Sequence, residues 1–264
     1  MTTAVLNCTP IVMSINSHDP LGGAGISADI EALSSLGCHC TPIISQLSIQ
    51  NPSSEPQDQQ TTSASLLIGQ MRSVLEDAQI DLIKVGQLTS LTHIEAVHTV
   101  LNDYPNIPVV LDPFTGNIKG HDLNQALCEL LFPLATITLL SETDAYHLSN
   151  SADSLSAYAH ELLEFESEYL LFTNTTHKTP QHKVCSLLYS SRGLCQQYER
   201  ERLSGHFHGG GDTLSAALAA YLAHGLSMAE SVQQAQHFTW QALQKAKRIG
   251  MGELIPDRMH WANE

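Results

Sequence analysis

The stretch Gly209-Gly210-Gly211-Asp212 runs directly into Thr213-Leu214-Ser215-Ala216-Ala217-Leu218-Ala219-Ala220-Tyr221-Leu222, a helix pattern built from small and apolar residues. Glycine permits positive φ angles and lets another group approach the backbone closely. The first N–H groups of a helix have no partner within it, and together with the helix dipole they attract anions. Asp212 is therefore either the N-cap of the helix or a group with a chemical role, and this stretch alone favours neither.

Apolar runs alternate with helical patterns along most of the chain. Buried strands are expected over residues 11–15, 41–47, 82–85, 109–111, 135–140 and 169–173. Helices are expected over residues 26–36, 63–77, 94–101, 123–131, 144–148, 154–165 and 227–248, and an exposed loop over 51–62. The helix over 63–77 would bury Leu66, Leu67, Met71, Val74 and Leu75. Residues 184–198 indicate a β-hairpin. The order predicts one α/β domain over residues 1–264, with a mostly parallel sheet and an antiparallel edge.

The chain is acidic, because its 264 residues carry a formal net charge of −15. An acidic surface repels phosphate backbones, which disfavours nucleic acid as a partner. For an anionic nucleotide to bind, its negative charge would have to be compensated locally by helix N-termini, a few basic side chains and Mg²⁺. No apolar run is long enough to span a bilayer and residues 1–9 lack a secretory pattern, so we expect a cytoplasmic protein with no membrane partner. Its six cysteines are expected as reduced thiols.

Polar residues follow several of the expected strands. They are Ser17 and Asp19, Ser48 and Gln50, Gly86 and Gln87, Asp112, and Ser141. Ligands of open parallel sheets bind beyond the carboxyl ends of the strands. The agreement among these positions predicts a ligand site along that edge of the sheet.

A set of motifs in a fixed order carries a family resemblance. Asp19-Pro20-Leu21-Gly22-Gly23-Ala24-Gly25-Ile26-Ser27-Ala28-Asp29 resembles the N-terminal motif of the hydroxymethylpyrimidine/phosphomethylpyrimidine kinases, thiamine-pathway enzymes of the ribokinase-like superfamily. Further matches follow at Ser48-Ile49-Gln50-Asn51, Lys84-Val85-Gly86-Gln87-Leu88, Leu111-Asp112-Pro113, Pro133-Leu134-Ala135-Thr136, residues 208–217 and Ile249-Gly250-Met251-Gly252. Each glycine motif alone is weakly specific, whereas the ordered set covers nearly the whole chain.

The resemblance implies a ribokinase-like three-layer α/β/α sandwich and ATP-dependent phosphorylation of a pyrimidine alcohol, 4-amino-5-hydroxymethyl-2-methylpyrimidine, and then of its monophosphate. Carried over by position, the residues near the pyrimidine are Ser17, Gly22, Gly23, Asp29, Ser48, Gln50, Gln87 and Phe114. The amide of Gln50 suits an aminopyrimidine edge, although a glutamine that caps a strand fits the sequence equally well. For Asp29, a charge on the helix surface is the slightly favoured interpretation. Superfamily members are often dimers, so a homodimer is expected.

The same resemblance assigns roles to the opening stretch. The N–H groups of Gly209, Gly210, Gly211 and Asp212 would meet charge on the transferred phosphoryl group, and Asp212 would be the general base. Nucleotide binding would fall to Asp112, Ser141, Asp144 and Thr173, with Mg²⁺ at Asp112 and Asp144. The second phosphorylation starts from a phosphate oxygen that is already ionised. We therefore hypothesise that Asp212→Asn impairs phosphorylation of the alcohol more than that of the phosphate.

Several positions depart from the family pattern. The bifunctional pyrimidine kinases usually carry cysteine at Asp212, whereas pyridoxal kinases carry aspartate, which keeps a vitamin B6 kinase open as an alternative. Ser141 and Asp144 stand where the family has asparagine and glutamate, Thr173 replaces a lysine, and Gln87 replaces a methionine. The losses at Ser141 and Thr173 favour a further alternative, a catalytically weak paralogue that binds pyrimidine as a sensor or carrier. A dehydrogenase ranks last, because no G-x-G-x-x-G follows the first strand.

Overall fold

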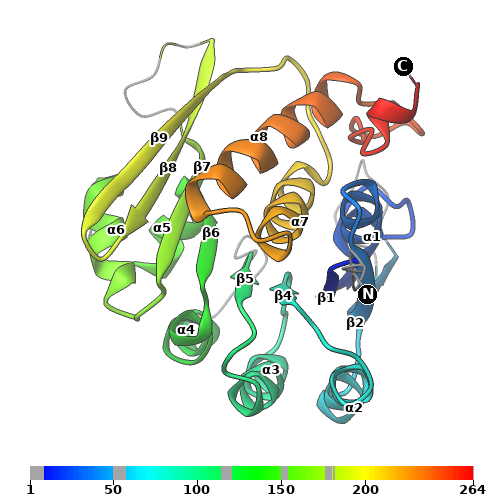
Figure 1. The fold of residues 1–264 in the computed structure, drawn as a ribbon, viewed down its shortest axis with the longest axis vertical. Coiled ribbons are helices and arrows are strands. Elements are labelled where there is room, and N and C mark those ends of the chain that lie inside the picture. The colour runs from blue at the N-terminus through cyan, green and yellow to red at the C-terminus, as the bar shows by residue number, and fades with distance from the viewer. Residues whose placement is uncertain are drawn as a thin grey trace, which may run out of the picture.

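The computed structural model describes residues 9–49, 58–113, 121–149, 154–175, 180 and 182–263. A nine-stranded sheet crosses this part of the chain in the order β3-β2-β1-β4-β5-β6-β7-β8-β9 (Figure 1). The strands are β1 (Ile11–His18), β2 (His39–Ile49), β3 (Asp58–Thr61), β4 (Leu82–Val85), β5 (Val109–Leu111), β6 (Ile137–Ser141), β7 (Tyr169–Thr175), β8 (Lys183–Ser190) and β9 (Gly193–Glu201). Strands β2, β1, β4, β5, β6 and β7 pair in parallel, whereas β3, β8 and β9 join antiparallel at the two edges.

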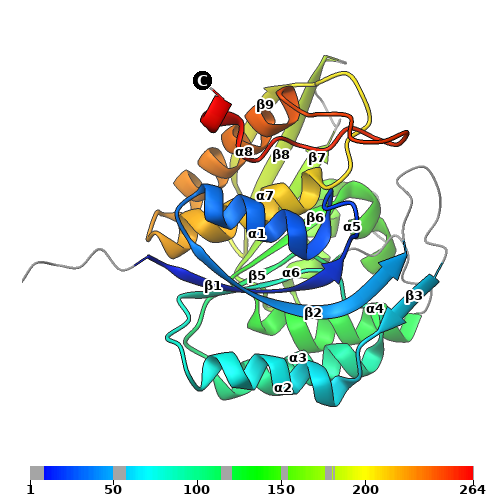
Figure 2. The same ribbon diagram turned by 90° about the vertical axis from the view of Figure 1, so that its right-hand side faces the viewer.

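Helices cover both faces of the sheet and make the three layers of an α/β/α sandwich (Figure 2). One layer contains α1 (Gly25–Ser35), α7 (Gly210–Ala223) and α8 (Met228–Gln244). The opposite layer contains α2 (Ala64–Leu75), α3 (Leu91–Asp103), α4 (His121–Ala126), α5 (Glu142–Leu148) and α6 (Leu155–Leu163). None of the helices in the described part of the chain has the length and apolar character needed to cross a membrane.

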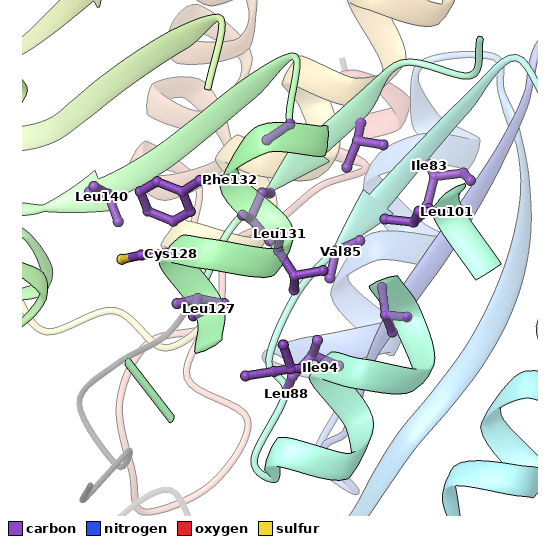
Figure 3. Close-up of a cluster of buried hydrophobic side chains, with 14 of the residues drawn as sticks. Ile83, Val85, Leu88, Ile94, Leu101, Leu127, Cys128, Leu131, Phe132 and Leu140 are labelled. Carbon is purple, nitrogen blue, oxygen red and sulfur yellow. The ribbon is translucent and has the colours of Figure 1, made fainter. Parts of the chain in front are cut away.

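Successive side chains along a strand point to opposite faces of the sheet, so the hydrophobic core consists of two clusters, one on each face. In β4, Leu82 packs with α1 and α7, whereas Ile83 and Val85 face α3 and the segment Leu127–Leu131. Figure 3 shows this second cluster, in which the side chains of Ile83, Val85 and Ile94 fill the space between sheet and helix. Full burial of one such side chain contributes roughly 1.5–3 kcal/mol relative to exposure. The two clusters hold the carboxyl ends of the strands in fixed positions.

The ribokinase-like α/β/α fold expected from the sequence is confirmed, and its differences from the expected elements are local. Residues 58–61 form edge strand β3 rather than a loop, because backbone hydrogen bonds to β2 require no apolar side chains. Leu66 is 54% exposed, since Leu67 and Met71 occupy the inner face of α2. The helix expected over 123–131 changes to a π-helical segment at Leu127–Leu131. The last long helix ends at Gln244.

Candidate active site

The anion-binding stretch begins with a glycine that no other residue can replace without strain. Gly209 is the N-cap of α7 and has φ of 85° and ψ of 16°. A Cβ atom there would collide with the carbonyl oxygen of Gly23. The turn before α1 and the turn before α7 therefore pack backbone against backbone. Because Gly209 is the N-cap, the interpretation of Asp212 as N-cap is wrong; Asp212 lies within the first turn of α7.

Asp19 and His208 connect these two turns. Asp19 Oδ2 accepts hydrogen bonds from the N–H groups of Gly23 and Ala24 at 2.9 and 3.0 Å, and it lies 3.0 Å from His208 Nε2. Burial opposes ionisation of Asp19, but the contact with His208 and the backbone donors hold its pKa below the ordinary value. The same contact raises the pKa of His208. Asp19 thus shapes the first turn and ties it to the residue that precedes Gly209.

Arg258 crosses the two turns from the C-terminal end of the described chain and is 1% exposed. Its Nη2 donates to the carbonyl oxygen of Gly23 at 2.5 Å, and its Nε donates to Thr213 Oγ1 at 2.8 Å. Its Nη1 pairs with Glu31 at 3.0 Å. A planar guanidinium can satisfy several acceptors at once, and here it joins the first turn to the start of α7.

A buried polar network contacts the carboxylate of Asp212 on the side of the sheet. Lys84 Nζ lies 2.6 Å from Asp29 Oδ1 and 3.5 Å from Asp212 Oδ1. The amide nitrogen of Asn16 donates to both Asp29 and Asp212 at 2.9 Å, and Ser14 donates to Asp29 at 2.7 Å. The side chains of Lys84 and Asp29 are 0% exposed, whereas Asp212 is 23% exposed. Asp212 is therefore the member of the network that a ligand can reach.

The pKa values follow from this network. Burial disfavours an ionised Asp212, but Lys84 and hydrogen bonds from Gly25 and Asn16 hold its pKa below the ordinary value. Burial would also lower the pKa of Lys84, but the surrounding carboxylates raise it instead. Burial and the neighbouring Asp212 raise the pKa of Asp112 to about 6, against the opposing effect of Lys84. Asp212 is consequently ionised at neutral pH.

A cleft of about 600 Å³ opens beside the N-terminus of α7. All four residues predicted to bind nucleotide border it, namely Asp112, Ser141, Asp144 and Thr173. Gly210 and Gly211 also line the cleft, so the anion-binding helix start is one of its walls. The next residue, Asp212, turns toward Asn16 on β1. The start of α7 thus separates the cleft from the side where β1 ends.

Two departures from the family pattern have local structural explanations. Ser141 and Asp144 form the capping box of α5, in which Ser141 Oγ and N lie 2.5 and 3.0 Å from Asp144 Oδ2. Asn174, which follows Thr173, has φ of 52°. Asparagine tolerates the left-handed region better than most residues. The short side chains at the cleft are therefore compatible with the local backbone.

The structure describes six of the eight residues predicted to bind pyrimidine. Ser17 and Gln87 come together at the ends of β1 and β4, where Ser17 Oγ donates to Gln87 Oε1 at 3.2 Å. Ser48 Oγ donates to the carbonyl oxygen of His18 at 2.8 Å. Asp29 is buried against Lys84, so its interpretation as a surface charge is wrong. The turn beside them contains Gly22 and Gly23, while Gln50 and Phe114 lie outside the described residues.

Sequence reasoning missed three residues of the site: Asn16, Arg258 and, as a partner of Asp212, Lys84. A signal existed for Lys84, which is the only charged residue in the apolar run Leu82–Val85. Asn16 likewise ends an apolar run. Arg258 gives no such signal, because its neighbours in the sequence show no strand or helix pattern.

The carboxylates at the cleft fit a magnesium ion that is shared with a nucleotide. Among the described residues, no three His, Cys, Asp or Glu side chains gather to hold a metal by themselves. Mg²⁺ is typically held by one or two carboxylates together with phosphate oxygens and water. Asp112 and Asp144 both border the cleft and could supply these carboxylates.

A mostly parallel sheet between helical layers, with a helix start and a carboxylate at one cleft, defines a ribokinase-like fold. The fold is similar to an ADP complex of Bacillus subtilis pyridoxal kinase, with a TM-score of 0.87, 21% identity and coverage of 97% of this chain and 100% of that chain. A phosphomethylpyrimidine kinase from Clostridium difficile gives a TM-score of 0.74 at 22% identity, covering 88% of this chain and 100% of that chain.

The sequence comparisons identify the family. Residues 19–257 match the model of the phosphomethylpyrimidine kinase family. The chain is 31% identical over 254 residues to a hydroxymethylpyrimidine/phosphomethylpyrimidine kinase of Mycobacterium bovis, covering 92% of this chain and 91% of that protein. This chain belongs to the phosphomethylpyrimidine kinase family, and the resemblance expected from its motifs is confirmed.

Proposed function

We propose that this chain transfers the γ-phosphoryl group of ATP to the hydroxymethyl group of 4-amino-5-hydroxymethyl-2-methylpyrimidine, to the corresponding monophosphate, or to both in turn, in thiamine biosynthesis or salvage. The observation that carries the proposal is the position of Asp212. Asn16 and Lys84 hold its carboxylate at a helix start between the cleft and the ends of β1 and β4. Family membership supports the same substrates.

In this proposal the two sides of the α7 start bind the two substrates. The pyrimidine lies beside Ser17, Gln87 and the turn at Gly22 and Gly23, and ATP lies in the cleft. Asp212 accepts the proton of the attacking hydroxyl group as its oxygen approaches the γ-phosphorus. The N–H groups of residues 209–212 donate to the phosphoryl oxygens, where charge accumulates during transfer.

Charge balance supports a role for Mg²⁺ in the same site. Lys84 is paired with Asp29, and Arg258 is paired with Glu31. The cleft is lined by the carboxylates of Asp112, Asp144, Glu201 and Glu253, against which Arg200, Arg202 and the partial positive charge of the α7 start stand as the positive groups for an incoming triphosphate. A bound Mg²⁺ would neutralise phosphate charge, with Asp112 and Asp144 as its protein ligands.

One assay tests the proposal. Purified protein is incubated with Mg-ATP and with hydroxymethylpyrimidine, its monophosphate or pyridoxal, and ADP release is measured. We expect ADP with at least one pyrimidine. ADP with pyridoxal alone would overturn the proposal in favour of the B6 kinase alternative, to which Asp212 lends support. Tight pyrimidine binding without ADP release would instead support the sensor alternative, in keeping with the short side chains at Ser141 and Thr173. Light scattering tests the expected homodimer.

A further inference from the structure

The side-chain amide of Asn16 is buried near the end of β1, where the residue is 1% exposed. Its nitrogen donates to Asp29 Oδ2 and to Asp212 Oδ1, each at 2.9 Å. Its oxygen accepts from the backbone N–H of Ser17 at 2.9 Å and from that of Gln87 at 3.2 Å. An asparagine amide has two N–H donors and an oxygen with two lone pairs, so these four contacts use its whole hydrogen-bonding capacity.

The neighbours of this amide fix both its position and its orientation. Gly86 packs against it so closely that a Cβ atom on Gly86 would lie 2.5–2.6 Å from Cγ, Nδ2 and Oδ1 of Asn16. A flipped amide would turn its oxygen toward two carboxylates and its N–H groups toward two other N–H donors. The hydrogen-bond network therefore determines which side of the amide carries the nitrogen.

The same amide connects the proposed base to the strand ends beside which the pyrimidine is proposed to bind. The oxygen of Asn16 holds the backbone of Ser17 and of Gln87, and both of these residues are predicted to contact the pyrimidine. The nitrogen of Asn16 holds the carboxylate of Asp212 on α7. One side chain thus sets the distance between the base and the substrate.

Asn16 is also the nearer of two groups that hold one oxygen of Asp212. Asn16 Nδ2 lies 2.9 Å from Asp212 Oδ1, whereas Lys84 Nζ lies 3.5 Å from it. Lys84 is closer to Asp29, at 2.6 Å. Two contacts with the same oxygen restrict the rotation of the carboxylate, and the side chain of Asp212 remains 23% exposed. Asp212 is therefore held in one orientation and still open to a substrate.

We infer that Asn16 is a positioning residue for phosphoryl transfer to an alcohol, because its amide holds Asp212 where the carboxylate meets the substrate hydroxyl group. In this step the hydroxyl oxygen gives its proton to Asp212 and forms a bond to the γ-phosphorus of ATP. The bond from that phosphorus to the β,γ-bridging oxygen breaks, and ADP leaves. The inference rests on the proposed function for the role of Asp212, and it adds the residue that aligns this base. Catalytic groups that are slightly misplaced lose much of their effect on the rate.

A double-mutant cycle tests the inference. The values of kcat and KM for hydroxymethylpyrimidine are measured at saturating Mg-ATP in the parent, Asn16→Ala, Asp212→Asn and the double variant. We expect Asn16→Ala to lower kcat by about 10- to 100-fold, because the base is present but no longer held. It should also raise KM, because Ser17 and Gln87 lose their shared acceptor. In the Asp212→Asn background the same change should lower kcat by less than about 3-fold.

The cycle separates positioning from a structural role. Equal losses of kcat in the two backgrounds would show that Asn16 does not act through Asp212 and would overturn the inference. Asn16→Ser provides a milder variant, because a hydroxyl group supplies one donor in place of two. Its kcat should lie between those of the parent and Asn16→Ala, and a parent-like kcat in folded Asn16→Ser would overturn the inference even if Asn16→Ala does not fold. Asn102→Ala, which alters an exposed asparagine on α3, is the matched control and should leave kcat and KM unchanged.

The inference and the proposed function can fail separately. Running the same cycle with pyridoxal covers the alternative alcohol: coupling between Asn16 and Asp212 with pyridoxal alone would support the inference and overturn the proposed function. Independent losses in a chain that phosphorylates hydroxymethylpyrimidine would overturn the inference alone. A chain that phosphorylates only the monophosphate would overturn the inference, because Asp212 then accepts no hydroxyl proton, and would leave the proposed function standing.

Discussion

Replacing Asp212 with asparagine removes one negative charge and keeps the size of the side chain. The asparagine oxygen can still accept the hydrogen bond from Asn16, and Lys84 keeps its closer partner Asp29 at 2.6 Å. We therefore expect the variant to fold with a Tm close to that of the parent. What it loses is the group that accepts a proton from the substrate hydroxyl.

The magnitude follows from the environment of Asp212. A positioned general base typically contributes about 10²–10⁴-fold. Lys84 and two hydrogen-bond donors hold the pKa of Asp212 below its ordinary value, which makes it a weak base. Phosphoryl transfer also depends more on positioning and charge than on proton removal. We expect a loss in the lower part of that range, about 10²–10³-fold, for the pyrimidine alcohol.

The monophosphate provides the internal comparison. Its attacking oxygen is already ionised at neutral pH, so Asp212→Asn should change its phosphorylation by less than about 10-fold, below the range for a lost general base. Initial rates of ADP release with each pyrimidine at saturating Mg-ATP measure both steps, and calorimetry verifies substrate binding. Asp122→Asn, which removes an exposed aspartate from the first turn of α4, is the matched control. Equal losses in both steps with binding intact would refute the role of Asp212 as a base.

Three further changes test the turns around the site. Gly209→Ala should prevent folding or lower the free energy of unfolding by more than about 3 kcal/mol, because the new Cβ would collide with the backbone of Gly23. The control Gly69→Ala, in the interior of α2 where a Cβ meets no other atom, should raise that free energy by about 0.5–1 kcal/mol. Urea unfolding measures both. Arg258→Met should lower the free energy of unfolding by about 2–4 kcal/mol by leaving buried acceptors unpaired, and the exposed Arg192→Met should change it by less than about 0.5 kcal/mol. The pKa of His208 is raised above 6.5 in the folded state. The contact between His208 and Asp19 therefore stabilises the fold fully below pH 6.5, and this contribution is lost as the pH rises through the folded pKa. In the same unfolding assay, His208→Gln should lower the free energy of unfolding more at about pH 6 than at about pH 9.

The fold could be predicted from the sequence wherever side chains alone determine an element. The strands Leu82–Val85 and Val109–Leu111 were predicted with the bounds that the structure has, because they are buried on both faces and read as apolar runs. Strand β3 could not be predicted, since its sequence Asp-Gln-Gln-Thr carries no apolar pattern and its pairing is made by the backbone. The exposure of Leu66 depends on the rotation of α2 against the sheet, which periodicity describes only coarsely.

The residues of the site likewise fall into those that the sequence predicts and those that it does not. Residues that lie at strand ends, such as Asp112 and Ser141, could be placed at the ligand-binding edge of the sheet from the order of the strands, and both border the cleft. Arg258 could not, because its role depends on the path of the C-terminal segment back across two turns. The burial of Asp29 depends on the ion pair with Lys84, which lies 55 residues away in the chain. Such pairs become visible only when the strands are assembled.

Asp212 stands where the resemblance to the bifunctional pyrimidine kinases leads us to expect cysteine, and the buried network explains how the fold accommodates an aspartate there. A carboxylate introduced beside a buried Asp29 would meet strong repulsion if no cation lay between them. Lys84 lies within 3.5 Å of both, and it belongs to the Lys84–Leu88 segment that resembles the family motif. Asn16 donates one amide hydrogen to each carboxylate and so bridges the two. The cation and the donor that stabilise an aspartate at this position thus come from strands β1 and β4, which also carry Ser17 and lead into Gln87. An aspartate at position 212 is for this reason compatible with the site proposed for the pyrimidine, although the same residue also fits the vitamin B6 kinase alternative.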